Sequence, residues 1–252
     1  MSGGAVKRVE LESAFVLHNR AYRESSLITE IFGRDTGRLG LVAKGARRPK
    51  SALRGMLQSF QPLLLSWTGS GELGLLIGAE PDGYARPLTG KALFSGLYMN
   101  ELLMRLMHRH DPHAELFLNY ARALEALAQG QRSDAVLRVF EKQMLEAIGY
   151  GLVLDHDIDS GEPIDVDRAY RYKPDRGPTS HKDDDQGEDE DEDGVRVGGN
   201  TLLSLARENL ESDCVLDEAK QLMRVVLRRY LGDRPLATRS LFRARARSPG
   251  TN

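Results

Sequence analysis

The chain has 252 residues, 40% of them hydrophobic, so it can bury a sizeable core, and we expect two small domains rather than one large one. No run of eighteen apolar residues occurs, and residues 1–12 carry charges with no apolar segment behind them, so no membrane span or signal peptide is expected and the predicted location is the cytoplasm. The formal net charge of −2 is unremarkable, and the single cysteine, Cys214, excludes an internal disulfide and a multi-cysteine zinc site, so we expect it to be a buried small hydrophobic residue.

Short apolar or alternating runs, punctuated by glycines, predict β-strands in the first third of the chain. They cover residues 15–18, 27–32, 39–43, 63–67 and 73–77. Five short strands with glycine turns fit a small barrel, and the five-stranded OB-fold is a nucleic-acid-binding barrel of this size. We therefore predict an α+β protein in which an N-terminal five-stranded OB-fold barrel, residues 1–82, is followed by an all-helical C-terminal domain, residues 83–252.

Farther along the chain, the apolar residues recur every three to four positions, which predicts helices. Asp111 is the expected N-cap of the second helix, with Pro112 at its first position, and the first three helices should pack together. Gly149 and Gly232 are the expected stops of the third and fifth helices. The predicted helices cover about 94–106, 112–127, 133–148, 201–210 and 217–231.

The negative charge of the chain is concentrated in one run. Nine acids lie between Asp183 and Asp193, and without them the remaining residues carry about +7. The surrounding segment, residues 174–194, offers nothing to bury and is predicted to be a loop or disordered. Basic zones lie on either side of it in the sequence, because residues 36–71 contain no acid and only one acid occurs from residue 219 onward. This distribution is typical of a protein that binds polyanions.

The most specific feature is a basic stretch at residues 43–51, directly after a predicted strand. Pro49 stiffens this loop, and its cations can neutralise several phosphates, with release of counterions. An ordinary solvated turn is the alternative, but the absence of acids from the flanking segment favours nucleic-acid binding. A nucleotide-hydrolysing phosphate loop is not expected, because Pro49 lacks the N–H that glycine would supply there. The candidate DNA contacts are Arg38, Lys44, Arg47, Arg48, Lys50 and Arg54.

Aromatic residues among the predicted strands could stack on unpaired bases if they were exposed. We expect Phe15, Phe32 and Phe60 to lie in the core, as most phenylalanines do. Tyr22 has an arginine on either side within two positions and is the residue we expect to be exposed.

The remaining polar clusters do not predict chemistry. Asp155, Asp157 and Asp159 alternate like calcium-loop ligands, but Ser160 stands where the loop needs glycine and Val166 where it needs a bidentate glutamate. The six histidines have no partner acid or cysteine in a spacing that would indicate a triad or a zinc hydrolase. We expect no metal, no cofactor and no catalytic centre.

A second basic cluster lies on the predicted helix 217–231. Arg228 and Arg229 follow Arg224 by four and five positions, and the other face of that helix is apolar. Such a stripe could contact DNA or an acidic peptide, or it could simply keep the helix soluble. Four more arginines extend the positive charge toward the end of the sequence and are a candidate secondary DNA contact: Arg239, Arg243, Arg245 and Arg247.

Motifs spread over nearly the whole chain resemble the RecO family of bacterial recombination mediators. No single motif is diagnostic, but they occur in the family's order. They are AFVLH at 14–18 followed by Tyr22 and ESSL at 24–27, GR at 37–38, LVAKGAR at 41–47, LQ at 57–58, PLLL at 62–65, GLYMNELL at 96–103, FE at 140–141, GYG at 149–151, GEP at 161–163, and LG at 231–232 before PL at 235–236.

The resemblance implies an OB-fold followed by a helical domain and a role in DNA repair rather than catalysis. Proteins of this family bind single- and double-stranded DNA and anneal complementary strands. They act with RecR to load RecA onto DNA coated by single-strand-binding protein (SSB), whose acidic C-terminal tail they recognise. By this resemblance Lys44, Arg47, Arg48 and Lys50 would contact the DNA backbone, and Arg138 would meet the SSB tail.

The sequence departs from some relatives in two places. A four-cysteine zinc module that can follow the GYG motif is missing, so zinc is not expected. The acidic run has no counterpart in the family and is either a tolerated insertion or a screen for the basic surface. Two other functions stay open: an interaction scaffold that touches nucleic acid incidentally, and a nuclease or nucleotidyl enzyme that binds magnesium through carboxylates at 155–167.

Overall fold

The computed structural model describes residues 8–69, 71–84, 86–180, 194–232 and 234–238. The chain divides into two compact units, Met1–Gly130 with Leu236–Asn252, and Gln131–Pro235. The first unit therefore consists of two segments that are separated in the sequence by the whole of the second. The boundary at 82/83 between a DNA-binding and a helical domain stays a prediction.

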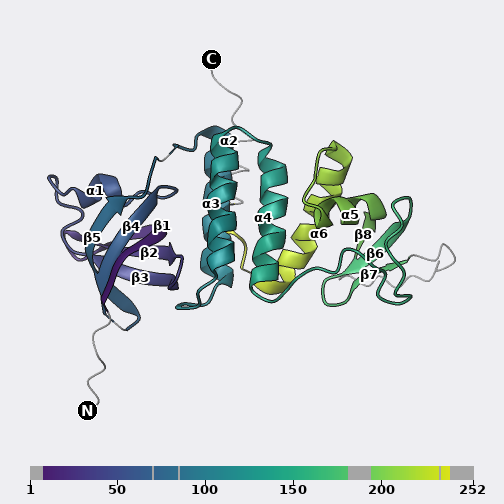
Figure 1. The fold of residues 1–252 in the computed structure, drawn as a ribbon, viewed down its shortest axis with the longest axis horizontal. Helices are drawn as coiled ribbons and strands as arrows, with labels where there is room; N and C mark the ends of the chain where they lie inside the picture. The colour runs from purple at the N-terminus through teal and green to yellow at the C-terminus, as the bar shows by residue number, and fades with distance from the viewer. Residues whose placement is uncertain (1–7, 70, 85, 181–193, 233, 239–252) are drawn as a thin grey trace, which may run out of the picture. The chain divides into compact units, whose positions relative to one another are not determined.

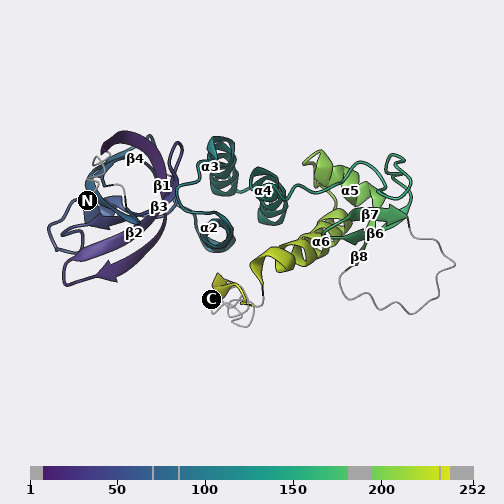
Figure 2. The same cartoon turned by 90° about the horizontal axis from the view of Figure 1, so that it is seen from below.

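The first unit begins with a closed barrel of five strands, whose curvature is visible in Figures 1 and 2. Its strands follow one another round the barrel in the order β1-β2-β3-β5-β4, and β3 and β5 are the parallel pair. This confirms the barrel and all five predicted strand positions, although β1 is much longer than the run that predicted it. The strands are β1 (Arg8–Tyr22), β2 (Ser26–Gly33), β3 (Gly37–Ala43), β4 (Pro62–Thr68) and β5 (Leu73–Pro81).

The barrel interior is filled by alternate side chains of the strands. Val16, Ile31, Leu41 and Leu65 are completely buried there, and Trp67 packs among them with 3% of its surface exposed. Burying side chains of this size contributes about 1.5–3 kcal/mol each, so this cluster stabilises the barrel substantially. A buried Trp67 is not available for base stacking.

One outer face of the barrel is also buried, because helices of the same unit cover it. Phe15 and Phe32 point out of the barrel and pack against Phe117 and Tyr120, with ring centroids 5.1–6.2 Å apart. Both phenylalanines are buried, as predicted, whereas Phe60 is only half-buried. Burial on both faces explains why nearly every residue of β2 is buried, including the polar residues Ser26, Thr29 and Glu30. The helices of this unit are α1 (Leu53–Met56), α2 (Gly90–Leu106) and α3 (Ala114–Ala128).

The start of α3 differs from the prediction. The helix begins at Ala114 with His113 as its N-cap, and Asp111 and Pro112 lie before it. The helix does not begin earlier because the backbone N–H of His110 donates to the carbonyl of Arg38 on β3, and His110 has a positive φ of 58°. The side chain of Asp111 pairs with the ring of His113 instead of capping the backbone.

A buried polar chain connects the barrel to both long helices of the unit. The side-chain amide of Asn100 on α2 donates to the carbonyl of Leu17 on β1 at 2.9 Å, and the hydroxyl of Tyr120 on α3 donates to the Asn100 carbonyl oxygen. Burial raises the pKa of Tyr120 far above its usual value, so the hydroxyl keeps its proton. These bonds fix the helices on the barrel in one register.

The segment that follows the second unit returns to α2. The carboxylate of Glu101 accepts hydrogen bonds from the backbone N–H groups of Ala237 and Thr238, at 2.7 and 2.9 Å, and from the Thr238 hydroxyl at 2.7 Å. Leu236 and Thr238 are buried. Burial alone would raise the pKa of Glu101, but the bonds from Thr238 and Ala237, with help from Arg105, lower it below the usual glutamate value.

This anchor should loosen in acid. Because the folded-state pKa of Glu101 is depressed, the stabilisation is complete above the unfolded value of about 4.3 and is lost as the pH falls through the lower folded value. In NMR titrations we expect the Thr238 amide to report a transition below about pH 4.3 that disappears in Glu101→Gln. A transition at or above the unfolded glutamate value would contradict this assignment.

The second unit packs helices on a small sheet. Its elements are α4 (Ser133–Ala147), β6 (Ala169–Lys173), β7 (Gly177–Ser180), β8 (Val195–Gly198), α5 (Gly199–Ala206) and α6 (Asp213–Leu231), and the sheet order is β7-β6-β8 (Figure 1). The carboxylate of Glu218 on α6 accepts bonds from the Gly198 N–H at 3.0 Å and the Thr201 hydroxyl at 2.6 Å. Glu218 thus ties α6 to β8 and α5.

The α+β class and the order of barrel and helices are confirmed, and the sheet is a correction to the expectation of an all-helical second part. The predicted loop at 174–194 is also partly wrong, since Gly177–Ser180 forms β7 and residues 181–193, with the acidic run, lie outside the described residues. The helix stops at Gly149 and Gly232 are confirmed by their positive φ angles of 85° and 66°. Cys214 is exposed, so its expected burial was wrong.

Candidate nucleic-acid interface

The basic stretch of the sequence forms the connection between β3 and α1. Lys44, Arg48 and Lys50 are exposed on this connection, and Arg54 is exposed on α1. The connection is a series of turns, in which the backbone N–H of Arg48 donates to the Gly45 carbonyl at 3.0 Å. The side chains of these four cations form no ion pair or hydrogen bond among the described residues, so each can approach a phosphate without first breaking a bond.

Gly45 is the position where this loop needs a glycine. Its φ of 70° lies in the left-handed region, and its α-carbon faces the side chain of Arg48, whose nearest atoms would lie 3.6 Å from an added Cβ. The turn at Gly45 directs the chain from the end of β3 into the exposed segment that carries the cations.

Arg47 fastens the loop to the turn between β1 and β2. Its backbone N–H donates to the carbonyl of Ser25 at 2.9 Å, and its guanidinium lies 3.3 Å from the carbonyls of Arg23 and Glu24. Arg47 was predicted to contact DNA, and the structure gives it a positioning contact as well, although its side chain is still exposed.

The turn between β1 and β2 adds cations that the sequence did not single out. Arg20 and Arg23 are exposed, and Arg23 has a φ of 51° that turns it back over Tyr22, with its guanidinium carbon 5.1 Å from the ring centroid. Tyr22 is half-buried rather than fully exposed, and Arg23 covers its ring. The pairing of β2 with both β1 and β3 brings the short β1–β2 turn beside the end of β3, and no local sequence pattern indicates this arrangement.

Arg38 occupies a different environment from the other predicted contacts. Its guanidinium donates to the carbonyl of Met104 at the end of α2, and its Nε is buried with no hydrogen-bond partner among the described residues. Burial lowers the pKa of Arg38 below its usual value; Glu30 opposes this effect and Arg109 adds to it. Arg38 is thus occupied with packing of the first unit, and the candidate interface does not depend on it.

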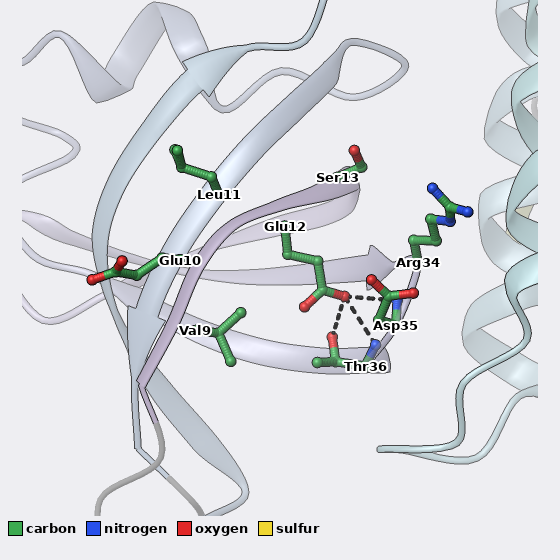
Figure 3. A pocket seen from close by; sticks show the side chains of 8 residues that line it. All are labelled: Val9, Glu10, Leu11, Glu12, Ser13, Arg34, Asp35 and Thr36. Atoms are coloured by element: carbon green, nitrogen blue, oxygen red, sulfur yellow. Dashed lines mark hydrogen bonds between the residues drawn. The ribbon is translucent and has the colours of Figure 1, made fainter.

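The opposite end of β2 carries a polar pocket of the reverse charge, shown in Figure 3. A bulge in β1, with a φ of 50° at exposed Leu11, directs Glu12 inward. One oxygen of Glu12 accepts three bonds of 2.9 Å from the backbone N–H groups of Asp35 and Thr36 and the Thr36 hydroxyl. The carboxylate therefore closes the turn between β2 and β3, and this pocket is a structural feature rather than a candidate site.

The candidate residues of the second unit differ in their availability. Arg138 on α4 is mostly buried and forms an ion pair at 2.6 Å with buried Glu141. Arg229 is exposed but forms an ion pair at 3.0 Å with Asp175 in the turn before β7. Arg224 and Arg228 are exposed on α6. The four arginines near the end of the sequence lie outside the described residues.

The aspartates at 155–159 form a structural loop. Asp157 is buried and accepts bonds from the backbone N–H groups of Asp159, Ser160 and Ser180, the last at 2.6 Å. Burial would raise the pKa of Asp157, but these bonds outweigh it and lower the pKa. Among the described residues, no three histidine, cysteine or acidic side chains gather in a way that could hold a metal ion.

None of the helices that the structure describes is both long and apolar enough to cross a membrane.

Comparison with known proteins matches both parts of the chain to one family. The model for the recombination protein O N terminal matches residues 8–83, and that for the recombination protein O C terminal matches residues 87–240. The DNA repair protein RecO of Azoarcus sp. (strain BH72) is 46% identical over 94% of this chain and 97% of its own length. The protein of the same name from Alkalilimnicola ehrlichii is 47% identical over 96% of this chain and 94% of its own length.

Proposed function

Since the chain belongs to the RecO family of DNA repair proteins, we propose that it is a recombination mediator that binds single- and double-stranded DNA and anneals complementary strands. In this role it acts with RecR to load RecA onto single-stranded DNA that SSB covers. The chemistry is binding and exchange of partners, so we expect no cofactor, no metal and no catalytic residue. The expected location is the cytoplasm, at the nucleoid.

One observation carries this proposal: the cations of two neighbouring turns are gathered at one end of an OB-type barrel. Lys44, Arg48 and Lys50 come from the loop after β3, Arg54 from α1 at the end of that loop, and Arg23 from the turn after β1. The bonds of Arg47 hold the two turns together, which reduces the conformational entropy lost when a strand binds. Cations on loops of this kind bind phosphates with little regard to sequence, as a mediator of repair at any site requires.

We propose that Arg138 contacts the SSB tail. RecR and RecA are further proposed partners. A tail carboxylate would have to share the Arg138 guanidinium with Glu141, whose bond occupies one of its nitrogens. The guanidinium has five donors and the bond to Glu141 uses one of its nitrogens, so the 11% of the side chain that is exposed can still donate to a second acceptor.

The test is annealing of complementary oligonucleotides, bare and SSB-coated, across a salt series. We expect annealing of both substrates, with a rate that falls steeply with salt and is unchanged by a chelator. When the strands are coated with SSB that lacks its acidic tail, we expect their annealing to be lost. A chain that retains no oligonucleotide in dilute buffer would exclude the proposal, and an activity lost on chelation would favour a metal-dependent nuclease.

A further inference from the structure

A straight row of cations lies on the solvent-facing side of α6 in the second unit. Lys220, Arg224 and Arg228 follow one another at intervals of four residues, and all three are exposed. The opposite side of the helix is buried through residues that include Leu222, Met223 and Val226. Since side chains four residues apart lie on one face, the row extends over about 12 Å of helix.

The three cations are available, unlike other basic residues of this unit. Arg132 and Arg229 form ion pairs with Asp213 and Asp175, whereas the row makes no ion pair or hydrogen bond within the described part of the chain. Asp217 is an exposed acid one turn before Lys220 on the same side. The net charge of that side of the helix is therefore about +2.

The helix holds this row rigidly. Nineteen residues form one continuous helix, which Figure 2 shows beside the sheet of its unit. The bonds of Glu218 to β8 and α5 prevent it from turning about its axis. Lysine and arginine side chains on such a fixed backbone lose less entropy on binding than those of a mobile loop.

The chemistry of the surface favours a sugar-phosphate backbone over an acidic peptide. Each of the three cations can neutralise one phosphate of an unpaired strand, with release of counterions. An amphipathic peptide would also need an apolar anchor, and none of the large hydrophobic side chains exposed among the described residues belongs to α6.

We propose that Lys220, Arg224 and Arg228 form a second strand-binding site, so that one chain can hold two strands at the same time. The inference rests on the proposed function, because it assumes that the turns of the barrel hold the first strand. It assigns to α6 what annealing requires, namely a contact for the complementary strand. Arg138 and Arg229 are not part of this second site, because they form ion pairs with Glu141 and Asp175.

The test is a bridging assay with two oligonucleotides that cannot pair. One oligothymidine is immobilised, the full-length chain is added, and retention of a second, labelled oligothymidine is measured at 0.1 M salt. We expect the variant Lys220→Ala/Arg224→Ala/Arg228→Ala to lose about a hundredfold in bridging, because each lost contact removes about 0.7 from the salt slope. Binding of the chain to the immobilised oligonucleotide alone should fall no more than about twofold, because the first site is intact.

The matched control removes three exposed arginines from other elements of the same unit, Arg176, Arg196 and Arg207. It should bridge like the unchanged protein, and both variants should keep the circular-dichroism melting curve. Equal bridging by the row variant, or equal loss in the control, would overturn the inference while leaving the first site in place. Loss of binding to a polyglutamate peptide with bridging intact would assign the row to acidic proteins and would also overturn it. An unchanged chain that retains no oligonucleotide would instead overturn the proposed function.

Discussion

Replacing Lys44, Arg48 and Lys50 together by alanine is expected to weaken binding to single-stranded DNA about a hundredfold at 0.1 M salt. Each phosphate contact contributes about 0.7 to the slope of log affinity against log salt for a single strand, so three contacts lower the slope by about 2. The difference should shrink toward 1 M salt, where counterion release contributes nothing. Fluorescence anisotropy of a labelled oligothymidine over a salt series measures both quantities.

The matched control for this variant removes Arg34, Arg86 and Arg122, three exposed arginines of the first unit outside the cationic turns. It changes the net charge equally, so a nonspecific field effect would appear in both variants. If the two variants had the same salt slope, the turns would not be the DNA contact. Arg47→Ala should lower affinity as well, through a looser loop, because the bonds to Arg23 and Glu24 are lost.

Breaking the ion pair between Arg109 and Glu30 is expected to destabilise the barrel by about 2 kcal/mol, less than the 3–5 kcal/mol of a fully buried pair. The Glu30 side chain is 10% exposed and that of Arg109 is 34% exposed, so Arg109→Met leaves a nearly buried carboxylate without its partner. The cost is reduced because the positive charge of Arg38 acts on Glu30 as well. The double variant Arg109→Met/Glu30→Met should recover most of the loss, since it removes both charges.

The single tryptophan makes this prediction easy to measure. Trp67 lies inside the barrel, so its fluorescence in a urea titration reports unfolding of the barrel rather than of the second unit. A double variant as unstable as the sum of its single variants would show that Arg109 and Glu30 do not interact energetically. Arg122→Met, on the exposed side of α3, is the control for loss of an arginine.

The sequence predicts the barrel well because its strands are short apolar or alternating runs that glycines interrupt at the turns. It fails for β6, β7 and β8, which have four or five residues each and include arginine, glycine and proline. Segments this short carry too few apolar positions for a period of two to be recognised. Their place in a sheet follows from tertiary contacts that no local pattern contains: β6 pairs with β7 and β8, and β8 contacts α5 and α6.

The residues of the candidate interface could also be predicted only in part from the sequence. Composition identifies the exposed cations at 44–54, because a stretch without acids is visible in the sequence alone. It cannot show that Arg38 and Arg47 donate to carbonyls of Met104 and Arg23, since those partners are distant in the sequence. It also passes over Arg23, which joins the interface only through the pairing of β1 with β2.

The motif GLYMNELL, one of those that carry the family resemblance, has a structural explanation. Asn100 connects β1 to α3, and its neighbour Glu101 holds Ala237 and Thr238. Two adjacent polar residues on one helix thus fasten segments that are far apart in the sequence. Residue type alone would not identify Asn100 or Glu101 as a tertiary contact, because polar residues are common in amphipathic helices.

The return of the chain to α2 has a consequence for the order in which the protein is made. The ribosome completes Gln131–Pro235 before it releases Ala237 and Thr238, so Glu101 waits without its partners while the entire second unit is synthesised. The barrel can form on the nascent polypeptide, but Glu101 gains its contacts with Ala237 and Thr238 only after the second unit has been translated. Slow translation of Gln131–Pro235 would therefore prolong the state in which the first unit lacks these contacts.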